Sequence, residues 1–487
     1  YKGYLAWSKL GMGEDLPKGV FRDWKHWCQF PHYFFDDPAM PAVKDKFGSV
    51  KTPIMAANAI DDLWAMPRSR DAFMSGYPKG TWQGVDINPA DFGLKSIGHM
   101  GYFRRQALPL WRHALAWLEE ANTDMATLIA SGNSSFAGDI YFNNNLAAWQ
   151  KANNTFALRV LIALSKKESD GDLNVKGKFA NIVTNPGKYP IFTSNADNMQ
   201  FVYNSTLNKY PVSPDNYGFD ALRYNMSSTN LSVLTYLKDP RVFVIAEPAG
   251  AKLKAGSGYT DFASFVGADA NQDLADMSTK MQVSNGGNFL NGEYSLYNRY
   301  RYYRTFTAEP GIQIGYSEMC FNIAEAAHRG WVSENASTWY ENGIKASFDR
   351  FGVKNGAMDV YAFKNGGTPT NAADYIKNTY NFDEAAYFSQ ATVKYAGANE
   401  NGLRQIITQK YLSFFQSSGL EGYYNFRRTN YPTFSANGPG TGNSGLIPKR
   451  YQYPTGERTN NAANWQAALD RQFGGKDEIN ADMWILK

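Results

Sequence analysis

The feature that most constrains the fold is a set of helical stripes that recur in separate blocks of the chain. The clearest stripe lies within residues 315–331, where apolar side chains fall at the spacing of one buried helix face: Tyr316, Met319, Cys320, Ile323, Ala324 and Ala327. Gly330 follows the last apolar position and predicts the end of this helix. We therefore expect Cys320 on the buried face.

The same periodicity predicts further helices over residues 104–129, 146–165, 337–351 and 403–416. Small residues lie where two helices would have to approach closely, which is typical of tetratricopeptide-like helix hairpins. No strict repeat period of about 34 residues is present, so any repeats are degenerate. The sequence therefore predicts an all-α fold of helix pairs interrupted by long insertions.

The insertions differ in composition from the helical blocks. Residues 36–100, 185–312 and 430–465 are rich in Gly, Asn, Pro, Ser and aromatic residues, and their aromatic content argues against disorder. The whole chain contains 31 Tyr, 31 Phe and 12 Trp but only 19% charged residues. Aromatic rings stack on the apolar faces of sugars, and amides hydrogen-bond to the hydroxyl groups. An aromatic-rich core accounts for most of these rings by number, and a glycan-binding surface is the alternative that this composition leaves open.

Charge and cysteine content exclude several classes of function. The net charge of +4 is not concentrated in a basic block, which argues against a nucleic-acid partner. No segment reaches the roughly 18 apolar residues of a membrane-spanning helix. Cys28 and Cys320 lie far apart without metal-binding spacing, so one disulfide or two buried thiols both remain open. The chain begins at Tyr1 without a start Met or signal peptide, and we interpret it as a mature or trimmed form.

No complete catalytic or metal site emerges from the sequence. Asp61 and Asp62 are adjacent carboxylates beside a tryptophan, as in a glycosidase, but paired Asp also caps helices. Glu325 and His328 have the Glu-x-x-His spacing of di-iron bundles, although no second such pair exists. Residues 269–273 alternate Asp and Asn like a calcium loop but lack its Gly and distal Glu. We therefore expect binding rather than turnover, with no cofactor and at most a structural calcium.

Six stretches of the chain carry a family resemblance. They are DIYFNNNLAAWQKANNTFALRVLIALS (139–165), LKDPRVFVIAEP (237–248), YSEMCFNIAEAAHRGW (316–331), YENGIKASFDRFGV (340–353), IITQKYLSFFQSSGLEGYYNFRRTNYP (406–432) and IPKRYQYPTGERTNNAANWQAAL (447–469). In this order they resemble the SusD/RagB superfamily of outer-membrane nutrient-binding lipoproteins, and within it the SusD-like branch. They cover most of the chain from residue 139 onward, and none is a catalytic motif.

This resemblance implies a single SusD-like domain over residues 1–487 that contains four tetratricopeptide-like helix pairs. The scaffold is expected at about 104–180 and 316–487, and irregular segments at about 36–100 and 185–312 are expected to form the ligand-binding face. The resemblance also implies a cell-surface lipoprotein of the outer membrane that is not an enzyme. It would capture oligosaccharides or other nutrients and pass them to a TonB-dependent, SusC-like transporter. The N-terminal lipid anchor is inferred from the family, since the sequence has no cysteine before Cys28.

The resemblance places the ligand site partly in the early loops and partly in the segment before the third helix pair. The residues that it implies for ligand contact are Trp64, Tyr77 and Trp82 in the first region, and Phe265, Tyr297, Asn298 (or Arg299) and Tyr300 in the second. The rings are expected to stack on sugars, each contributing on the order of 1 to 2 kcal/mol. Two other functions remain open, namely an all-α glycoside hydrolase using Asp61 and Asp62 and a scaffold that grips another protein. The bound glycan or peptide is not predicted.

Overall fold

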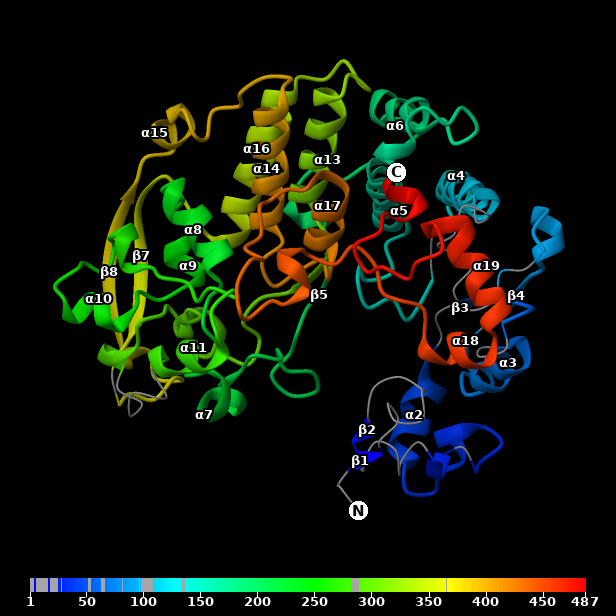
Figure 1. Cartoon of the computed structure of the whole chain (residues 1–487), viewed down its shortest axis with the longest axis horizontal. Coiled ribbons are helices and arrows are strands. Elements are labelled where there is room, and N and C mark those ends of the chain that lie inside the picture. Colours follow the sequence, from blue (N-terminus) through cyan, green and yellow to red (C-terminus); the bar gives the residue numbers. More distant parts are fainter. Residues whose placement is uncertain are drawn as a thin grey trace. The chain divides into compact units, whose positions relative to one another are not determined.

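The computed structural model describes residues 4–5, 16–17, 25–27, 29–50, 54–62, 66–80, 82–95, 97, 108–133, 136–281, 289–364 and 366–487 (Figure 1). The chain forms two compact units. The first contains Tyr1–Ala147, Lys166–Leu173 and Pro448–Lys487, and the second contains Ala148–Ser165 and Asn174–Ile447. The two segments that were predicted to form one ligand-binding face, 36–100 and 185–312, belong to different units.

The first unit contains a small βαβ motif. Strand β3 (Ile54–Ala59) pairs in parallel with β4 (Trp82–Ile87), and α3 (Pro67–Met74) packs on both strands. Two parallel strands need such a crossover because a tight turn cannot join them. Further strands and α-helices among the described residues of this unit are β1 (Tyr4–Leu5), β2 (Leu16–Pro17), α2 (Pro41–Ser49), α4 (Leu108–Ala130), α18 (Thr455–Asn460) and α19 (Ala462–Phe473).

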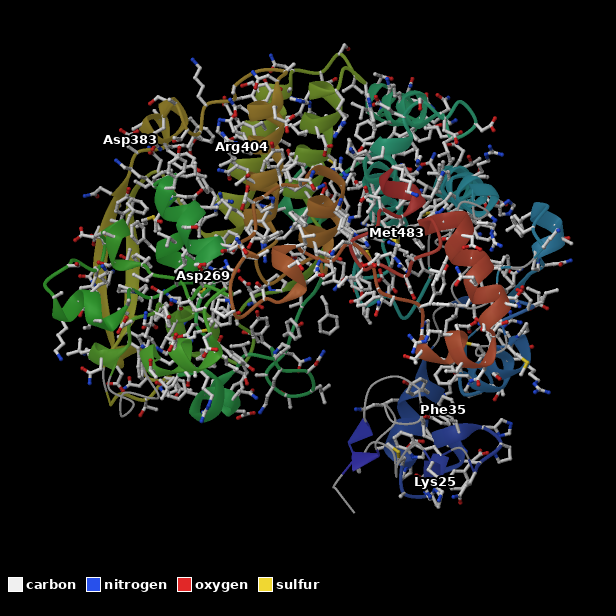
Figure 2. All side chains as sticks on the ribbon, viewed as in Figure 1. Lys25, Phe35, Asp269, Asp383, Arg404 and Met483 are labelled. Atoms are coloured by element: carbon white, nitrogen blue, oxygen red, sulfur yellow. The ribbon has the colours of Figure 1, made fainter. Side chains whose placement is uncertain are left out.

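Aromatic rings build a local core in the first unit. Phe34, Phe35, Phe47, Phe73 and Tyr77 contact one another with ring centroids 4.5 to 6.2 Å apart. Phe35, which is labelled in Figure 2, is buried at the centre of this cluster. Such tilted and edge-to-face contacts are the arrangements that aromatic rings prefer. Part of the aromatic excess in the sequence therefore serves packing.

The second unit is organised around α13 (Tyr316–His328), α14 (Ala336–Phe351) and α16 (Glu400–Ser413), which lie side by side in Figure 1. The predicted stripe of α13 is confirmed, because Met319, Cys320 and Ile323 are all fully buried. Gly330 has a φ of 71°, and the amide of Trp331 donates to the carbonyl of Ala326 at 2.8 Å. This left-handed glycine ends the helix as expected.

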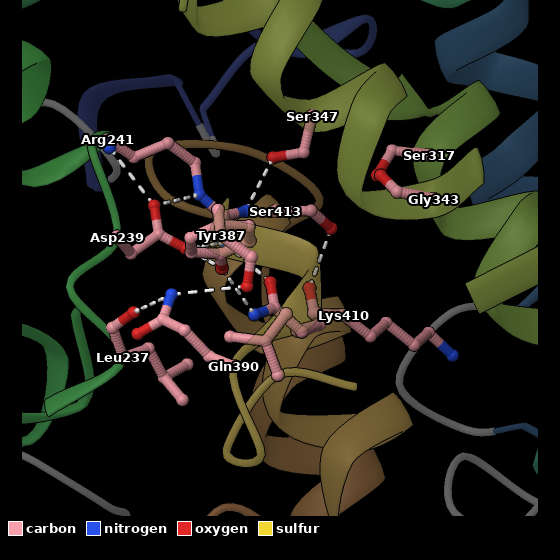
Figure 3. A network of polar contacts seen from close by, with 12 residues as sticks. Leu237, Asp239, Arg241, Ser317, Gly343, Ser347, Tyr387, Gln390, Lys410 and Ser413 are labelled. Carbon is pink, nitrogen blue, oxygen red and sulfur yellow. Dashed lines mark hydrogen bonds and ion pairs between the residues drawn. The ribbon is translucent and has the colours of Figure 1, made fainter. Parts of the chain in front are cut away.

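Helices α13 and α14 approach each other closely at Gly343. A Cβ atom at Gly343 would lie 2.7 Å from the ring of Phe321 on α13. The hydroxyl of Ser317 donates to the Gly343 carbonyl at 2.7 Å, and both residues are labelled in Figure 3. A small residue thus allows a close contact between the helices, as the sequence predicted, and here it is a glycine of α14.

The remaining helices of the second unit are α5 (Leu146–Ala163), α6 (Val175–Thr184), α7 (Tyr217–Asp220), α8 (Ser228–Tyr236), α9 (Val242–Ile245), α10 (Gly250–Lys254), α11 (Leu274–Lys280), α12 (Arg299–Tyr302), α15 (Glu384–Ser389) and α17 (Glu421–Thr429). The helices predicted over 146–165, 337–351 and 403–416 are confirmed as α5, α14 and α16. None of the helices among the described residues is long and apolar enough to cross a membrane.

The fold is mostly helical, but the all-α prediction omitted several short strands. Besides the strands of the first unit, β5 (Met199–Phe201) pairs with β6 (Gly311–Ile314), and β7 (Gly356–Phe363) pairs with β8 (Tyr375–Phe382). Along β7 the side chains of Met358, Val360 and Ala362 are buried while Asp359 is exposed. This alternation is the period of a half-buried strand.

A buried polar network joins residues 237–243 to the helices of the second unit (Figure 3). The guanidinium of Arg241 donates to both carboxylate oxygens of Asp239, at 2.9 and 2.6 Å, and to the hydroxyl of Ser347 at 2.8 Å. It also donates to Gln409, and the hydroxyl of Tyr387 donates to Asp239 at 2.7 Å. These bonds satisfy a charged pair that is almost completely removed from solvent.

Candidate ligand-binding surfaces

In the first unit, Trp82 is the predicted contact residue whose ring is most accessible. Trp82 begins β4 and is 36% exposed. Tyr77 is partly buried and packs edge to face on Phe47 and Phe73, with centroids 5.1 and 6.2 Å apart, and burial raises its pKa. Trp64 lies outside the described residues. Of the predicted contact residues that the structure describes in this region, Trp82 therefore has the more exposed side chain.

In the second unit, three of the predicted contact residues have structural roles instead. Phe265 is 5% exposed and packs on Phe243 in the core. Asn298 is 3% exposed, and its side-chain oxygen caps α12 by accepting from the amide of Arg301 at 3.1 Å. Arg299 is buried and forms a paired hydrogen bond to the carboxylate of Glu247. The prediction that Phe265, Asn298 and Arg299 contact a ligand is therefore corrected. Their side chains are too deeply buried to reach one.

Tyr300 is the middle member of a stack and presents neither face to solvent. The ring of Tyr361 lies parallel to it, with centroids 3.7 Å apart and planes inclined by 6°. The guanidinium carbon of Arg304 lies 4.4 Å from the Tyr300 centroid, and the ring of Tyr375 approaches edge-on at 5.2 Å. A stacked ring and a cation occupy opposite faces. The prediction that Tyr300 stacks on a sugar is therefore corrected.

Tyr361 is the outer member of this stack and was not among the residues predicted to contact a ligand. One face of its ring covers Tyr300, and no other ring or cation among the described residues contacts it. Its hydroxyl donates to Asp359 at 3.2 Å, beside the exposed ion pair of Asp359 with Lys377. Burial and the neighbouring Tyr300 raise the pKa of Tyr361 to about 12. The alternating pattern of residues 356–363 was the signal that could have revealed this outward-facing ring.

Tyr297 lies in a second aromatic group of the same unit. Its ring is partly buried and contacts Tyr224 and Phe415 edge-on, with centroids 6.2 and 5.8 Å apart. Its hydroxyl accepts a hydrogen bond from Gln416 at 2.9 Å, and burial raises its pKa. Tyr224 is exposed and was also missed by the sequence analysis. Tyr297 therefore contacts both the exposed ring of Tyr224 and the side-chain amide of Gln416.

A polar depression of about 640 Å³ opens between α11 and the segment near Asn437. It is an open, shallow depression rather than an enclosed cavity. The residues that line it mostly have polar side chains, and the aliphatic parts of these side chains also face the depression: Asn271, Gln272, Asp273, Asp276, Thr279, Lys280, Asn437, Gly438 and Pro439. Asp269, labelled in Figure 2, lies just before the first of these residues in the chain.

Two glycines hold the walls of this depression together. The amide of Gly440 donates to the carbonyl of Asn271 at 3.1 Å. A Cβ atom at Gly440 would lie 2.2 Å from the carbonyl oxygen of Gln272, and one at Gly438 would lie 2.3 Å from that of Asn271. Only residues without a side chain allow such a close backbone approach. The position of the second wall is therefore set by glycines far along the chain.

Several polar groups of the depression are available to a ligand. Gln272 accepts a hydrogen bond from the hydroxyl of Tyr294 at 2.6 Å, which orients its amide. Burial, together with nearby carboxylates that include Asp276, raises the pKa of Tyr294 and keeps this hydroxyl protonated. Within the part of the chain that the structure describes, the side chains of Asp276, Lys280 and Asn437 form no hydrogen bond or ion pair.

The oxygens of the calcium-like run serve the backbone. Asp269 accepts from the amide of Asn271 at 2.9 Å, and Asp273 caps α11 by accepting from the amide of Ala275 at 2.8 Å. Across the described residues there is no group of three or more His, Cys, Asp or Glu side chains positioned for a metal ion. Calcium binding at 269–273 stays a prediction.

The other acidic candidates have protein partners. Glu325 is buried and accepts from the guanidinium of Arg428 at 2.7 Å, whereas the ring of His328 contacts the hydroxyl of Tyr395 at 2.9 Å. Asp61 accepts from the amide of Ile97 at 2.8 Å, and Asp62 is buried. The geometry thus gives Glu325 and His328 a structural role. Of the two adjacent aspartates, Asp61 is hydrogen-bonded to the backbone and Asp62 is buried.

Comparison with known proteins identifies the family. A SusD-like family described as starch-binding and associating with the outer membrane matches residues 102–454. A SusD homologue from Bacteroides fragilis is 30% identical, with a TM-score of 0.63 over 77% of this chain and 74% of that chain. A second one from the same species is also 30% identical, with a TM-score of 0.59 over 77% and 75% of the two chains.

A protein of Bacteroides vulgatus, proposed to be an outer-membrane protein that binds nutrients, is 31% identical, with a TM-score of 0.60 over 77% and 75% of the two chains. None of the curated proteins matches this chain. Because the family match spans most of the chain and several homologous structures share its fold, the protein belongs to the SusD-like family, which is described as starch-binding and associating with the outer membrane.

Proposed function

We propose that this protein captures oligosaccharides at the cell surface and passes them to a TonB-dependent outer-membrane transporter, held there by an N-terminal lipid anchor. The observation that carries the proposal is the match of residues 102–454 to a family described as starch-binding and associating with the outer membrane. The accessible rings and the polar depression support a binding role. We also infer that the helix pairs, such as α13 with α14, are of the tetratricopeptide type.

The rings proposed to contact the glycan are accessible rings that lie at the positions predicted from the sequence or contact them. Trp82 in the first unit, and Tyr361 and the Tyr224–Tyr297 pair in the second, offer a ring face or edge to solvent. Tyr77 and Trp64 remain proposed contacts from the sequence. Stacking on a pyranose contributes on the order of 1 to 2 kcal/mol for each ring.

Calorimetry against a panel of neutral and acidic oligosaccharides and short peptides tests the proposal. Each mixture is also analysed for cleavage products after long incubation. The expected result is saturable binding of an oligosaccharide without products. Cleavage that is lost in Asp62→Asn would instead support the glycoside hydrolase alternative.

A matched pair of tryptophan variants tests the proposed contact of Trp82. Trp82→Ala is expected to weaken binding by roughly 5- to 30-fold if one ring contributes about 1 to 2 kcal/mol. Trp117→Ala is the control, since Trp117 lies in the same unit and is 37% exposed. Equal effects of the two variants would remove Trp82 from the site.

The transport step needs a separate experiment. The protein is co-expressed with the TonB-dependent transporter from its own organism, and the transporter is purified through an affinity tag. Co-purification of the two proteins is expected. If glycan binding is observed but the proteins never associate, the transfer part of the proposal fails and the binding part stands.

A further inference from the structure

We propose that the polar depression between α11 and residues 437–439 is a subsite for a neutral sugar, which it recognises through hydroxyl groups rather than by stacking. This inference rests on the proposed glycan binding and specifies where, and by what chemistry, one sugar of the glycan is held. It differs from the aromatic surfaces, because the lining of the depression contains no aromatic ring.

The free polar groups of the depression match the chemistry of sugar hydroxyls. Each sugar hydroxyl can donate one hydrogen bond and accept others. The carboxylate of Asp276 is an acceptor, the ammonium of Lys280 is a donor, and the amide of Asn437 is both. Hydrogen bonds that involve a charged group are stronger than neutral ones. Neighbouring hydroxyls could therefore bind a carboxylate and an ammonium group at the same time.

The charge of the lining selects against acidic sugars. Asp273 and Asp276 contribute two negative charges and Lys280 contributes one positive charge. Asp269 and Glu293 lie close enough for their charges to act on Tyr294, beside the same lining. The carboxylate of a uronic acid would be repelled by this field, because like charges brought together lower affinity. A cationic amino sugar would be attracted by Asp273 and Asp276 and repelled by Lys280, so the charge of the lining discriminates chiefly against anionic sugars. A neutral sugar avoids the repulsion that a uronic acid would meet.

The depression is built before a ligand arrives. Its two walls are joined through the close contacts of Gly438 and Gly440, and the side chain of Gln272 is held by Tyr294. The walls and Gln272 therefore lose little conformational freedom on binding, whereas the side chains of Asp276, Lys280 and Asn437 become ordered when the ligand binds.

The test uses two near-isosteric variants and two matched controls in the full chain. Asp276→Asn and Lys280→Gln remove one charge each from the depression. Glu341→Gln and Lys394→Gln make equivalent changes elsewhere on the second unit. Circular dichroism and thermal unfolding verify that all four variants fold. Calorimetry is then carried out with malto-, cello-, manno- and chito-oligosaccharides and with oligogalacturonate.

The expected result is that the wild-type protein binds a neutral oligosaccharide more tightly than oligogalacturonate. Each depression variant should weaken that binding about tenfold, which corresponds to about 1.4 kcal/mol, while both controls bind like the wild type. Asp276→Asn should also reduce the preference for the neutral ligand.

Other outcomes separate the two proposals. If the wild type binds a neutral oligosaccharide and the depression variants bind it equally well, the subsite is refuted while glycan binding stands. A wild type that prefers oligogalacturonate would refute the neutral-sugar class alone. Absence of binding to every oligosaccharide would overturn the proposed function, and this inference with it.

Discussion

Replacing Asp239 by asparagine tests whether the buried guanidinium of Arg241 depends on its carboxylate partner (Figure 3). Both side chains are almost fully buried, and two nearly parallel N–H bonds join them at 2.9 and 2.6 Å. Asparagine keeps the size of the side chain but removes the negative charge. It also places an NH2 group where an oxygen accepted hydrogen bonds, so that donors face donors.

The expected cost follows from the geometry of this pair. Removing one partner of a buried ion pair destabilises a protein by about 3 to 5 kcal/mol, because the remaining charge stays buried without compensation. The second unit consists of residues 148–165 and 174–447. With an unfolding entropy of about 2.1 cal/mol/K per residue, this loss of stability would lower its unfolding midpoint by roughly 5 to 8 °C. In contrast, Asp359 forms an exposed pair with Lys377 at 3.0 Å, and Asp359→Asn should cost less than about 1 kcal/mol.

Thermal and urea unfolding of the wild type, Asp239→Asn and Asp359→Asn at pH 7 provide the measurement. Adding Arg241→Met to Asp239→Asn removes the unpaired charge and should recover part of the lost stability. If Asp239→Asn proves no more destabilising than Asp359→Asn, the reasoning about buried charge in this network is wrong.

Three further predictions follow from single positions. Burial opposes ionisation of Glu325, but Arg428 lowers the pKa of its carboxyl group to about 2. The ionised carboxylate therefore stabilises the fold fully above the ordinary pKa of 4.5, and this stabilisation is lost as the pH falls towards 2. Glu325→Gln should therefore flatten the pH dependence of the unfolding free energy between about pH 4.5 and 2. Burial raises the pKa of Cys320 to about 12, and mass spectrometry should show that this thiol reacts with maleimide only after unfolding. Gly440→Ala places a Cβ atom 2.2 Å from a backbone oxygen, so it should lower the free energy of unfolding by about 1 to 3 kcal/mol and weaken glycan binding. Gly187 has open space around it, and Gly187→Ala should leave both stability and binding unchanged.

The helices were predictable because their signal is local. The apolar spacing of residues 316–328 identifies the buried face of α13 before any partner is known, and Gly330 marks its end through its own backbone preference. The strands were harder to predict from sequence, because β5 and β6 are only a few residues long and pair across a large separation.

The candidate site was less predictable because exposure depends on residues distant in sequence. Tyr300 and Tyr297 are close in the sequence and similar in type, yet the ring of Tyr300 is covered by Tyr361 and Arg304 on its two faces. Likewise, Phe265 belongs to an insertion but packs on Phe243 within the core. No local pattern distinguishes an aromatic ring that packs from one that binds.

By itself, the sequence determined the helical scaffold, the family and the general chemistry of binding, because periodicity, composition and motif order are properties of the chain alone. The tertiary structure decided which rings and polar groups reach solvent. The polar depression shows why, since α11 forms one wall and residues 437–439 form the other, and only folding brings them together. Accessibility is a property of packed surfaces, and packing depends on contacts between residues far apart in the chain.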